Sequence, residues 1–169
     1  MQVDSVTEDV RQNGFSVVPD VFSPSECNKY KEKLEADLER RLKSGRYAGS
    51  DSYQVLYHYF SDDFDLMNLV SHPDILAVMK RLIDQDFVLI SPSARNPRLH
   101  DDMKQSAATS GLGWHIDARL AGDGVTAFKP SLNFYAVIML NDFTPENGAT
   151  YVLPGSHSRY LRPASRDGD

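Results

Sequence analysis

The chain has 169 residues, 41% of them hydrophobic, and its 18 basic and 24 acidic side chains give a net charge of −6. This length suits one domain with its own core, since domains commonly span about 100–150 residues, and we expect residues 1–169 to form a single domain. A nucleic-acid binder usually carries a basic patch, so the acidic balance argues against nucleic acid and against an anionic membrane surface as partners.

The N-terminal residues are predicted to form a helix followed by a short strand. Ser5–Glu8 (SVTE) matches a capping box, and Gly14 is a typical helix stop, so we expect a helix between them. The apolar run Phe15–Pro19 (FSVVP) then predicts a strand.

A second and longer helix is predicted to begin at Ser23. Pro24 suits the first helical position and Glu26 the third, and Gly45 suits the end of the helix. The charged residues of this helix alternate in sign, as is typical of a solvated face. Its apolar residues recur in steps of three and four and predict one buried stripe: Cys27, Tyr30, Leu34, Leu38 and Leu42.

The middle of the chain mixes predicted strands and helices. Tyr53–Phe60 (YQVLYHYF) and Phe87–Ile90 (FVLI) are rich in β-branched and aromatic residues and predict strands. Asp65–Val70 and Pro73–Ile83 predict two helices, with Pro73 at a first-turn position. Asn96–Gly111 predicts a long loop, and loops of that length are usually functional.

The rest of the chain predicts β structure. Trp114–Asp117 is a short strand candidate, and Leu132–Leu140 (LNFYAVIML) is nearly all apolar, as in a strand buried on both faces. Thr144–Gly148 (TPENG) predicts a turn, and Ala149–Leu153 predicts a returning strand. Helices in front of antiparallel strands indicate an α+β chain with a mainly β core, a sandwich or a barrel.

The single cysteine, Cys27, excludes an intramolecular disulfide and a zinc site made of several cysteines. The longest apolar run, Phe134–Leu140, has seven residues, whereas a membrane-spanning helix needs about 20. The polar N-terminus does not look like a signal peptide. We therefore expect a cytoplasmic protein without a membrane partner.

His115-Ile116-Asp117 is the best candidate for a chemical site. Residues i and i+2 of a strand point to the same side, so the imidazole and the carboxylate can converge on one metal ion. With a second histidine they would form the facial triad of non-heme iron oxygenases, which leaves positions open for cosubstrate and oxygen. The alternative for the tripeptide alone is a polar pair on the surface.

The order of motifs around this tripeptide resembles the phytanoyl-CoA dioxygenase family. After the H-x-D come an apolar strand, a T-P-E-N-G turn and L-P-G-S-H at Leu153–His157. The opening G-F-S-V-V-P at Gly14–Pro19, followed by F-S-P-S-E at Phe22–Glu26, is also similar, as is S-H-P at Ser71–Pro73. The resemblance extends over essentially the whole chain.

This resemblance implies a double-stranded β-helix, a cupin-like jelly roll with N-terminal helices. It also implies a dioxygenase that uses iron(II), 2-oxoglutarate and molecular oxygen to oxidise a small organic substrate. His115 and Asp117 match the first two iron ligands. Related halogenating enzymes have Gly or Ala at the position of Asp117, so a carboxylate there favours hydroxylation or a related oxidation.

The family's second histidine, and an arginine that pairs with 2-oxoglutarate, would follow the P-G-S-H segment by some tens of residues. The sequence ends at Asp169, so we expect residues 1–169 to be the N-terminal portion of a longer domain and the jelly roll to be incomplete. The alternative interpretation is a degenerate, non-catalytic relative. For the 169-residue chain alone, one expected outcome is an assembly in which a second polypeptide supplies the absent strands. His157 itself matches a structural turn of the family rather than a ligand.

Asn133 and Tyr135 lie on one face of the predicted strand Leu132–Leu140, which lines the 2-oxoglutarate pocket in the family. We expect these two residues to bind the cosubstrate, and an ordinary core hydrogen bond is the alternative for a buried asparagine. Ser91, Ser93 and Arg95 follow a predicted strand and are candidates for the same pocket.

Two other function classes stay open. The first is a non-catalytic jelly-roll module that binds or interacts without turnover. The second is a zinc-dependent hydrolase, because the same ligand types also suit zinc.

Overall fold

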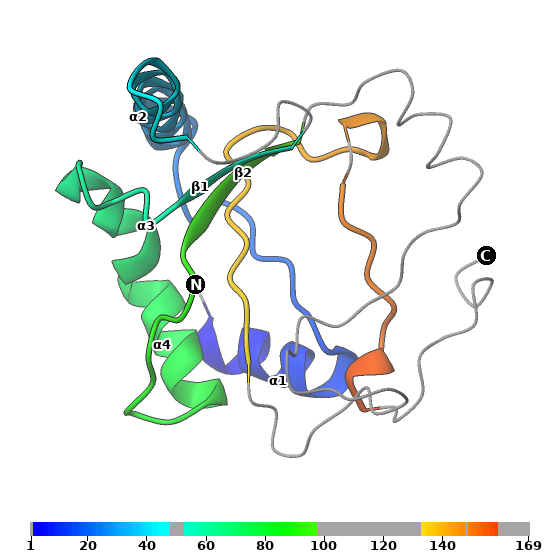
Figure 1. Ribbon diagram of the computed structural model, residues 1–169. Helices are drawn as coiled ribbons and strands as arrows, with labels where there is room; N and C mark the ends of the chain where they lie inside the picture. Colours follow the sequence, from blue (N-terminus) through cyan, green and yellow to red (C-terminus); the bar gives the residue numbers. More distant parts are fainter. Residues whose placement is uncertain (1, 48–52, 98–132, 148, 159–169) are drawn as a thin grey trace, which may run out of the picture.

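The computed structural model describes residues 2–47, 53–97, 133–147 and 149–158. Its elements in chain order are α1 (Val3–Asn13), α2 (Pro24–Lys43), β1 (Tyr53–Tyr57), the 3-10 helix η1 (Phe64–Leu66), α3 (Met67–Ser71), α4 (Pro73–Leu82), β2 (Ser93–Pro97) and two further 3-10 turns, η2 (Pro145–Asn147) and η3 (Ser156–Ser158). Helices α2, α3 and α4 lie to one side of the two-stranded sheet, and residues 149–158 lie to the other (Figure 1).

Helix α1 begins earlier than the sequence predicts. Gln2 is its N-cap, without a side-chain cap bond, so Ser5 lies inside the helix and the predicted capping box at Ser5–Glu8 is wrong. A capping box needs an extended N-cap residue, and here Gln2 has that conformation. The predicted stop is confirmed, because Gly14 is left-handed (φ 87°) and donates its N–H to Val10.

Helix α2 confirms the predicted capping box. The Ser23 hydroxyl accepts a hydrogen bond from the Glu26 N–H at 3.3 Å, and the Glu26 carboxylate accepts one from the Ser23 N–H at 2.8 Å. The predicted stripe is buried at Tyr30 and Leu38, but Leu42 is 45% exposed. The stripe therefore faces the core as far as Leu38 and leaves it in the last turn of the helix.

One charged side chain of α2 departs from the predicted solvated face. Asp37 is buried, with its carboxylate 2.8 Å from the Arg41 guanidinium. Arg41 also donates to the carbonyl of Tyr57 at 3.0 Å. A buried carboxylate needs such a partner, and this one ties α2 to the end of β1.

Strands β1 and β2 are antiparallel, with Val55 opposite Arg95 and Leu56 opposite Ala94. The prediction of a strand from Tyr53 is confirmed for its first five residues. It stops before Phe60, because His58 has a positive φ of 52°, which a continuing strand does not permit.

The predicted strand Phe87–Ile90 is wrong, since these residues form no strand and Val88 and Ile90 are 79% and 71% exposed. The second strand is Ser93–Pro97 and takes in the start of the predicted Asn96–Gly111 loop. Its pairing places the small Ala94 against the helical core, so tertiary packing rather than hydrophobicity selects the strand.

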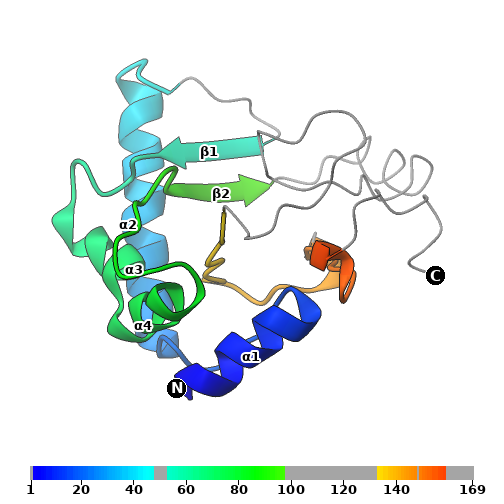
Figure 2. The same ribbon diagram turned by 90° about the horizontal axis from the view of Figure 1, so that it is seen from below.

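The core lies between α2, the sheet and the short helices. Helices predicted at Asp65–Val70 and Pro73–Ile83 are confirmed as η1 with α3 and as α4. Figure 2 shows α2 running past one end of both strands and α1 lying near α4. An ion pair at 2.9 Å joins Arg81 of α4 to Asp4 of α1. The buried cluster consists of Tyr30, Leu38, Leu56, Tyr59, Leu66 and Leu69.

Three further predicted strands are not observed, at Phe15–Pro19, Leu132–Leu140 and Ala149–Leu153. The described residues of these segments pair in no strand ladder. Residues 133–140 are also not buried on both faces: Ile138 packs against the core, whereas Val137 is 65% exposed. Extended chain becomes a strand only where a neighbouring strand accepts its hydrogen bonds.

The predicted turn at Thr144–Gly148 is confirmed for its described residues. Pro145–Asn147 form a 3-10 turn, and the Thr144 N–H donates to the Asn147 side chain at 2.8 Å. Within the described part of the chain the sheet has two strands, so the predicted mainly β core is not observed there. No helix in those same ranges combines the length and apolarity of a membrane span.

Candidate functional site

The face of the sheet turned away from the helices carries the residues predicted near the pocket. Strand residues alternate between faces, and Leu56 points into the core. Its neighbours Val55 and Tyr57, with their cross-strand partners Arg95 and Ser93, therefore share the opposite face. We call these four residues the open face.

Polar and aromatic groups both occur on the open face. Tyr57 is 54% exposed, and Arg95 is exposed as well. The Arg95 guanidinium donates to the Ser93 hydroxyl at 3.4 Å. The arrangement places a cation and a hydroxyl beside an aromatic ring, which suits recognition of an anionic group on an organic molecule.

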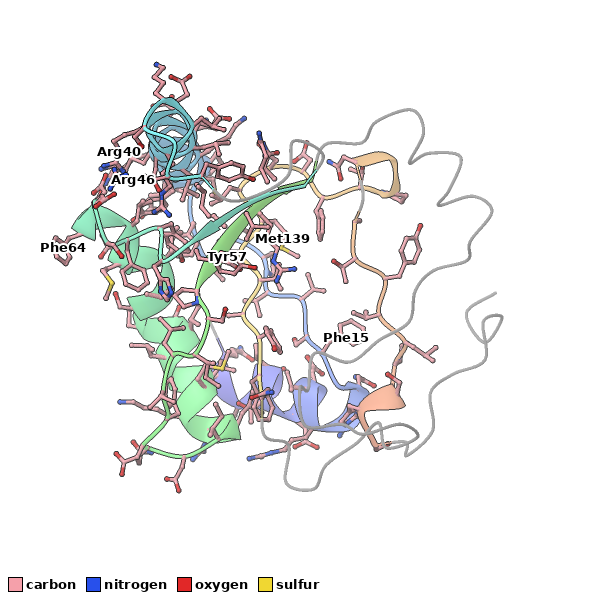
Figure 3. All side chains as sticks on the ribbon, in the orientation of Figure 1. Phe15, Arg40, Arg46, Tyr57, Phe64 and Met139 are labelled. Carbon is pink, nitrogen blue, oxygen red and sulfur yellow. The ribbon has the colours of Figure 1, made fainter. Side chains whose placement is uncertain are left out.

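Residues 133–147 carry the other residues that the sequence predicts to bind the cosubstrate. Ile138 and Leu140 pack against the core and fix this segment to the rest of the fold. Tyr57 from β1 and Met139 from this segment are labelled near the centre of Figure 3. Met139 is 47% exposed, so its side chain is available beside the anchored residues.

The two predicted cosubstrate residues lie at the start of this segment. Asn133 is exposed, and Tyr135 is 61% exposed. The expected burial of Asn133 is therefore not observed, and its amide needs no internal partner. Their polar groups lie on the surface of the described fold, where a ligand can reach them.

The predicted metal ligands His115 and Asp117 lie outside the described residues, as does the rest of the predicted strand Trp114–Asp117. In the described ranges, no three or more His, Cys, Asp or Glu side chains gather in a way that could hold a metal ion. The ligand types nevertheless suit the implied metal, since an imidazole and a carboxylate are two of the three donors that iron(II) oxygenases use.

His157 occupies a structural position, as its P-G-S-H motif implies. Its Nε2 lies 3.0 Å from the carbonyl oxygen of Arg11, at the end of α1. Its Nδ1 is buried and would lie 2.6 Å from a Cβ placed on Gly14. Both ring nitrogens therefore face α1. The sequence did not predict this contact. It indicated only a helix end at Gly14 and, separately, a turn at Leu153–His157.

The perturbed charges of the described chain lie away from the open face. The hydrogen bond from Lys33 holds the pKa of Asp63 below its ordinary value, and the hydrogen bond from Lys29 does the same for Asp65. Burial raises the pKa of Tyr59. The four charges join α2 to η1, so their role is structural.

Comparison with known proteins identifies the family. The family model for phytanoyl-CoA dioxygenase matches residues 10–169. A dioxygenase of Aspergillus terreus, trt7, is 21% identical over 163 residues, which cover 88% of this chain and 52% of the relative. The chain thus spans about half the length of that curated relative. No solved structure shows significant similarity to this chain. The predicted resemblance is confirmed: with nearly its whole length matched, this chain belongs to the phytanoyl-CoA dioxygenase family.

Proposed function

We propose that the chain belongs to a dioxygenase that uses iron(II) and 2-oxoglutarate to oxidise a small organic substrate. The observation that carries this proposal is the family match over residues 10–169, which includes the His115-Ile116-Asp117 tripeptide. The dioxygenase relative supports the same reaction class.

In this proposal His115 and Asp117 hold the metal through one imidazole nitrogen and one carboxylate oxygen. Bound iron(II), together with 2-oxoglutarate, supplies oxidation of a carbon–hydrogen bond by molecular oxygen. The protein fixes the ligand geometry and keeps positions open for cosubstrate and oxygen. Because Asp117 fills one coordination position, hydroxylation or a related oxidation is the proposed outcome.

Asn133 and Tyr135 are the proposed cosubstrate contacts. Their amide and phenol groups can donate hydrogen bonds to a carboxylate, and both side chains are exposed. Ile138 anchors the segment that carries them. Arg95 on the open face is a further candidate, because a guanidinium binds carboxylates in a bidentate manner.

Titration of the purified protein with iron(II) and 2-oxoglutarate, without oxygen, tests this function. Chelation of iron(II) by the keto acid gives a visible absorption band, and admission of oxygen should then yield succinate. Zinc in place of iron should give neither signal. If the folded protein hydrolyses ester or amide substrates with zinc and forms no succinate with iron, the hydrolase interpretation replaces the dioxygenase.

A second candidate, a module completed by another polypeptide, is favoured by a set of exposed apolar residues. Val88, Ile90 and Val137 are 79%, 71% and 65% exposed, and exposed apolar side chains mark an interface where they gather in one patch. We propose that a second polypeptide covers them in the active assembly. Light scattering should then give a mass above that of one chain, while a monomer at high concentration contradicts the self-association form of this proposal.

A further inference from the structure

The C-terminal end of α1 receives hydrogen bonds from a segment that follows it by more than a hundred residues. The last four carbonyl groups of a helix have no partner within it. The Gly155 N–H donates to the carbonyl of Asn13 at 2.8 Å, and His157 Nε2 lies 3.0 Å from the carbonyl of Arg11. Residues 149–158, here called the return segment, thus satisfy two carbonyls at this helix end.

The imidazole of His157 occupies space that only a glycine leaves free. A Cβ on Gly14 would lie 2.6 Å from His157 Nδ1 and 2.9 Å from its Cγ, closer than carbon and nitrogen atoms pack without repulsion. Gly14 is also left-handed, with φ 87°. This glycine therefore both ends the helix and admits the ring.

The contact defines which nitrogen of His157 carries a hydrogen. A carbonyl oxygen only accepts hydrogen bonds, so Nε2 must be the donor to Arg11. Nδ1 is buried and has no hydrogen-bond partner among the described residues. The ring therefore donates one hydrogen bond, from Nε2 to Arg11, and packs against the backbone of Gly14.

We propose that His157 is a positioning residue that anchors the return segment to α1. The turn at Pro145–Asn147 joins the return segment to residues 133–140, so the anchor fixes one end of the chain that carries Asn133 and Tyr135. The consequence for cosubstrate binding rests on the proposed function, whereas the anchoring itself does not.

A double-mutant cycle on the 169-residue chain tests the contact. Gly14→Ala introduces both a strained left-handed alanine and a clash with the ring. Gly45→Ala is the matched control, because Gly45 is also left-handed (φ 69°) and has nothing within 4 Å of an added Cβ. Gly14→Ala should lower the urea midpoint of unfolding more than Gly45→Ala does.

The additional loss of urea midpoint caused by Gly14→Ala, relative to Gly45→Ala, should vanish in a His157→Ala background. The ring is then absent, and the two alanines differ only in their place in the chain. Equal midpoint shifts for Gly14→Ala and Gly45→Ala in the wild-type background would overturn the proposal. So would an excess that persists without the ring.

Amide hydrogen exchange tests the hydrogen bond that His157 Nε2 donates to Arg11. It can be measured on folded variants whatever their urea midpoints are. His157→Phe keeps a ring but removes the donor, and the Gly155 amide should exchange about tenfold faster, which corresponds to about 1.4 kcal/mol. His157→Gln restores a donor and should restore most of the protection. The amide of Cys27, bonded within α2, is the internal reference.

If Gln protects no better than Phe, the anchor does not depend on a hydrogen bond and the proposal is wrong. Binding of 2-oxoglutarate in the presence of iron(II) is measured separately on the same variants. Absence of binding in the wild-type protein would reject the proposed function, while the amide exchange would still decide the anchor.

Discussion

The Lys33 ammonium on α2 lies 2.6 Å from a carboxylate oxygen of Asp63, directly before η1. It also lies 3.3 Å from Asp65, and the Lys29 ammonium lies 2.7 Å from the same carboxylate. Leu66 follows immediately and is fully buried. These ion pairs therefore join α2 to η1 at the edge of the buried core.

This cluster predicts a loss of stability in acid. The hydrogen bonds from Lys33 and Lys29 lower the pKa of Asp63 and Asp65 from the ordinary 3.8. A carboxyl with a lower pKa in the folded state contributes stability above its unfolded pKa. That contribution disappears as the pH falls from about 4 through the lower folded value, and urea midpoints measured across this range should show it.

The double variant Asp63→Asn, Asp65→Asn should show a weaker acid dependence, because the amides do not titrate. Asp86→Asn, at an exposed position, is the control and should follow the wild-type protein. An unchanged acid dependence in the double variant would mean that other carboxyl groups dominate acid unfolding.

Leu66→Ala should destabilise the fold by about 2–5 kcal/mol, the usual cost of a cavity at a fully buried leucine. Phe64→Ala, two residues earlier, removes a larger side chain that is 79% exposed and projects from η1 in Figure 3. It should change the free energy of unfolding by about 0.5 kcal/mol or less. Urea unfolding of both variants measures the contrast, and similar costs would contradict the assigned core.

Ser23→Ala should cost about 0.5–2 kcal/mol, because it removes the hydroxyl that caps α2. Ser5→Ala is the matched control, since Ser5 lies within α1, where alanine is the better helix former. Its effect on the free energy of unfolding should be near zero or slightly stabilising. A loss at Ser5 equal to that at Ser23 would favour the capping box that the sequence predicts for α1.

Asp117→Ala should abolish substrate oxidation in the active protein and leave the far-ultraviolet circular dichroism unchanged. Mutation of a residue that hydrogen-bonds to a metal ligand usually lowers metal affinity or activity by about 10–100-fold. Removal of the ligand itself should lower them by at least that factor. Asp86→Ala is the control. Near wild-type succinate formation coupled to substrate oxidation by Asp117→Ala would show that this carboxylate is not a required ligand.

The helices were predictable because their signals are local. Ser23, Pro24 and Glu26 specify the start of α2 within four residues, and Gly14 specifies the end of α1. The start of α1 was predicted wrongly because Ser5–Glu8 has the sequence of a capping box but lies inside the helix, whose N-cap is Gln2. Local patterns therefore locate helices better than they locate each terminus.

The strands were less predictable because pairing depends on a partner elsewhere in the chain. Phe87–Ile90 is the more apolar segment, yet Ser93–Pro97 pairs with β1 and places Ala94 against the core. For the candidate site, motif order predicted the family, which the family match confirms. The ligand assignment of His115 and Asp117, made from their spacing and from that resemblance, stays a prediction. The anchor between Arg11 and His157 joins residues 146 positions apart, and no local pattern encodes that proximity.

The bond between Asn13 and Gly155 also sets an order of events during synthesis. The buried cluster draws on residues from Tyr30 to Leu69, which leave the ribosome early and can pack soon after. Helix α1 is made before all of them, yet two of its terminal carbonyls acquire partners only when Gly155 and His157 emerge. Closing so long a loop is slow relative to local contacts. The C-terminal end of helix α1 is therefore secured only after the residues of the buried cluster are already available to pack.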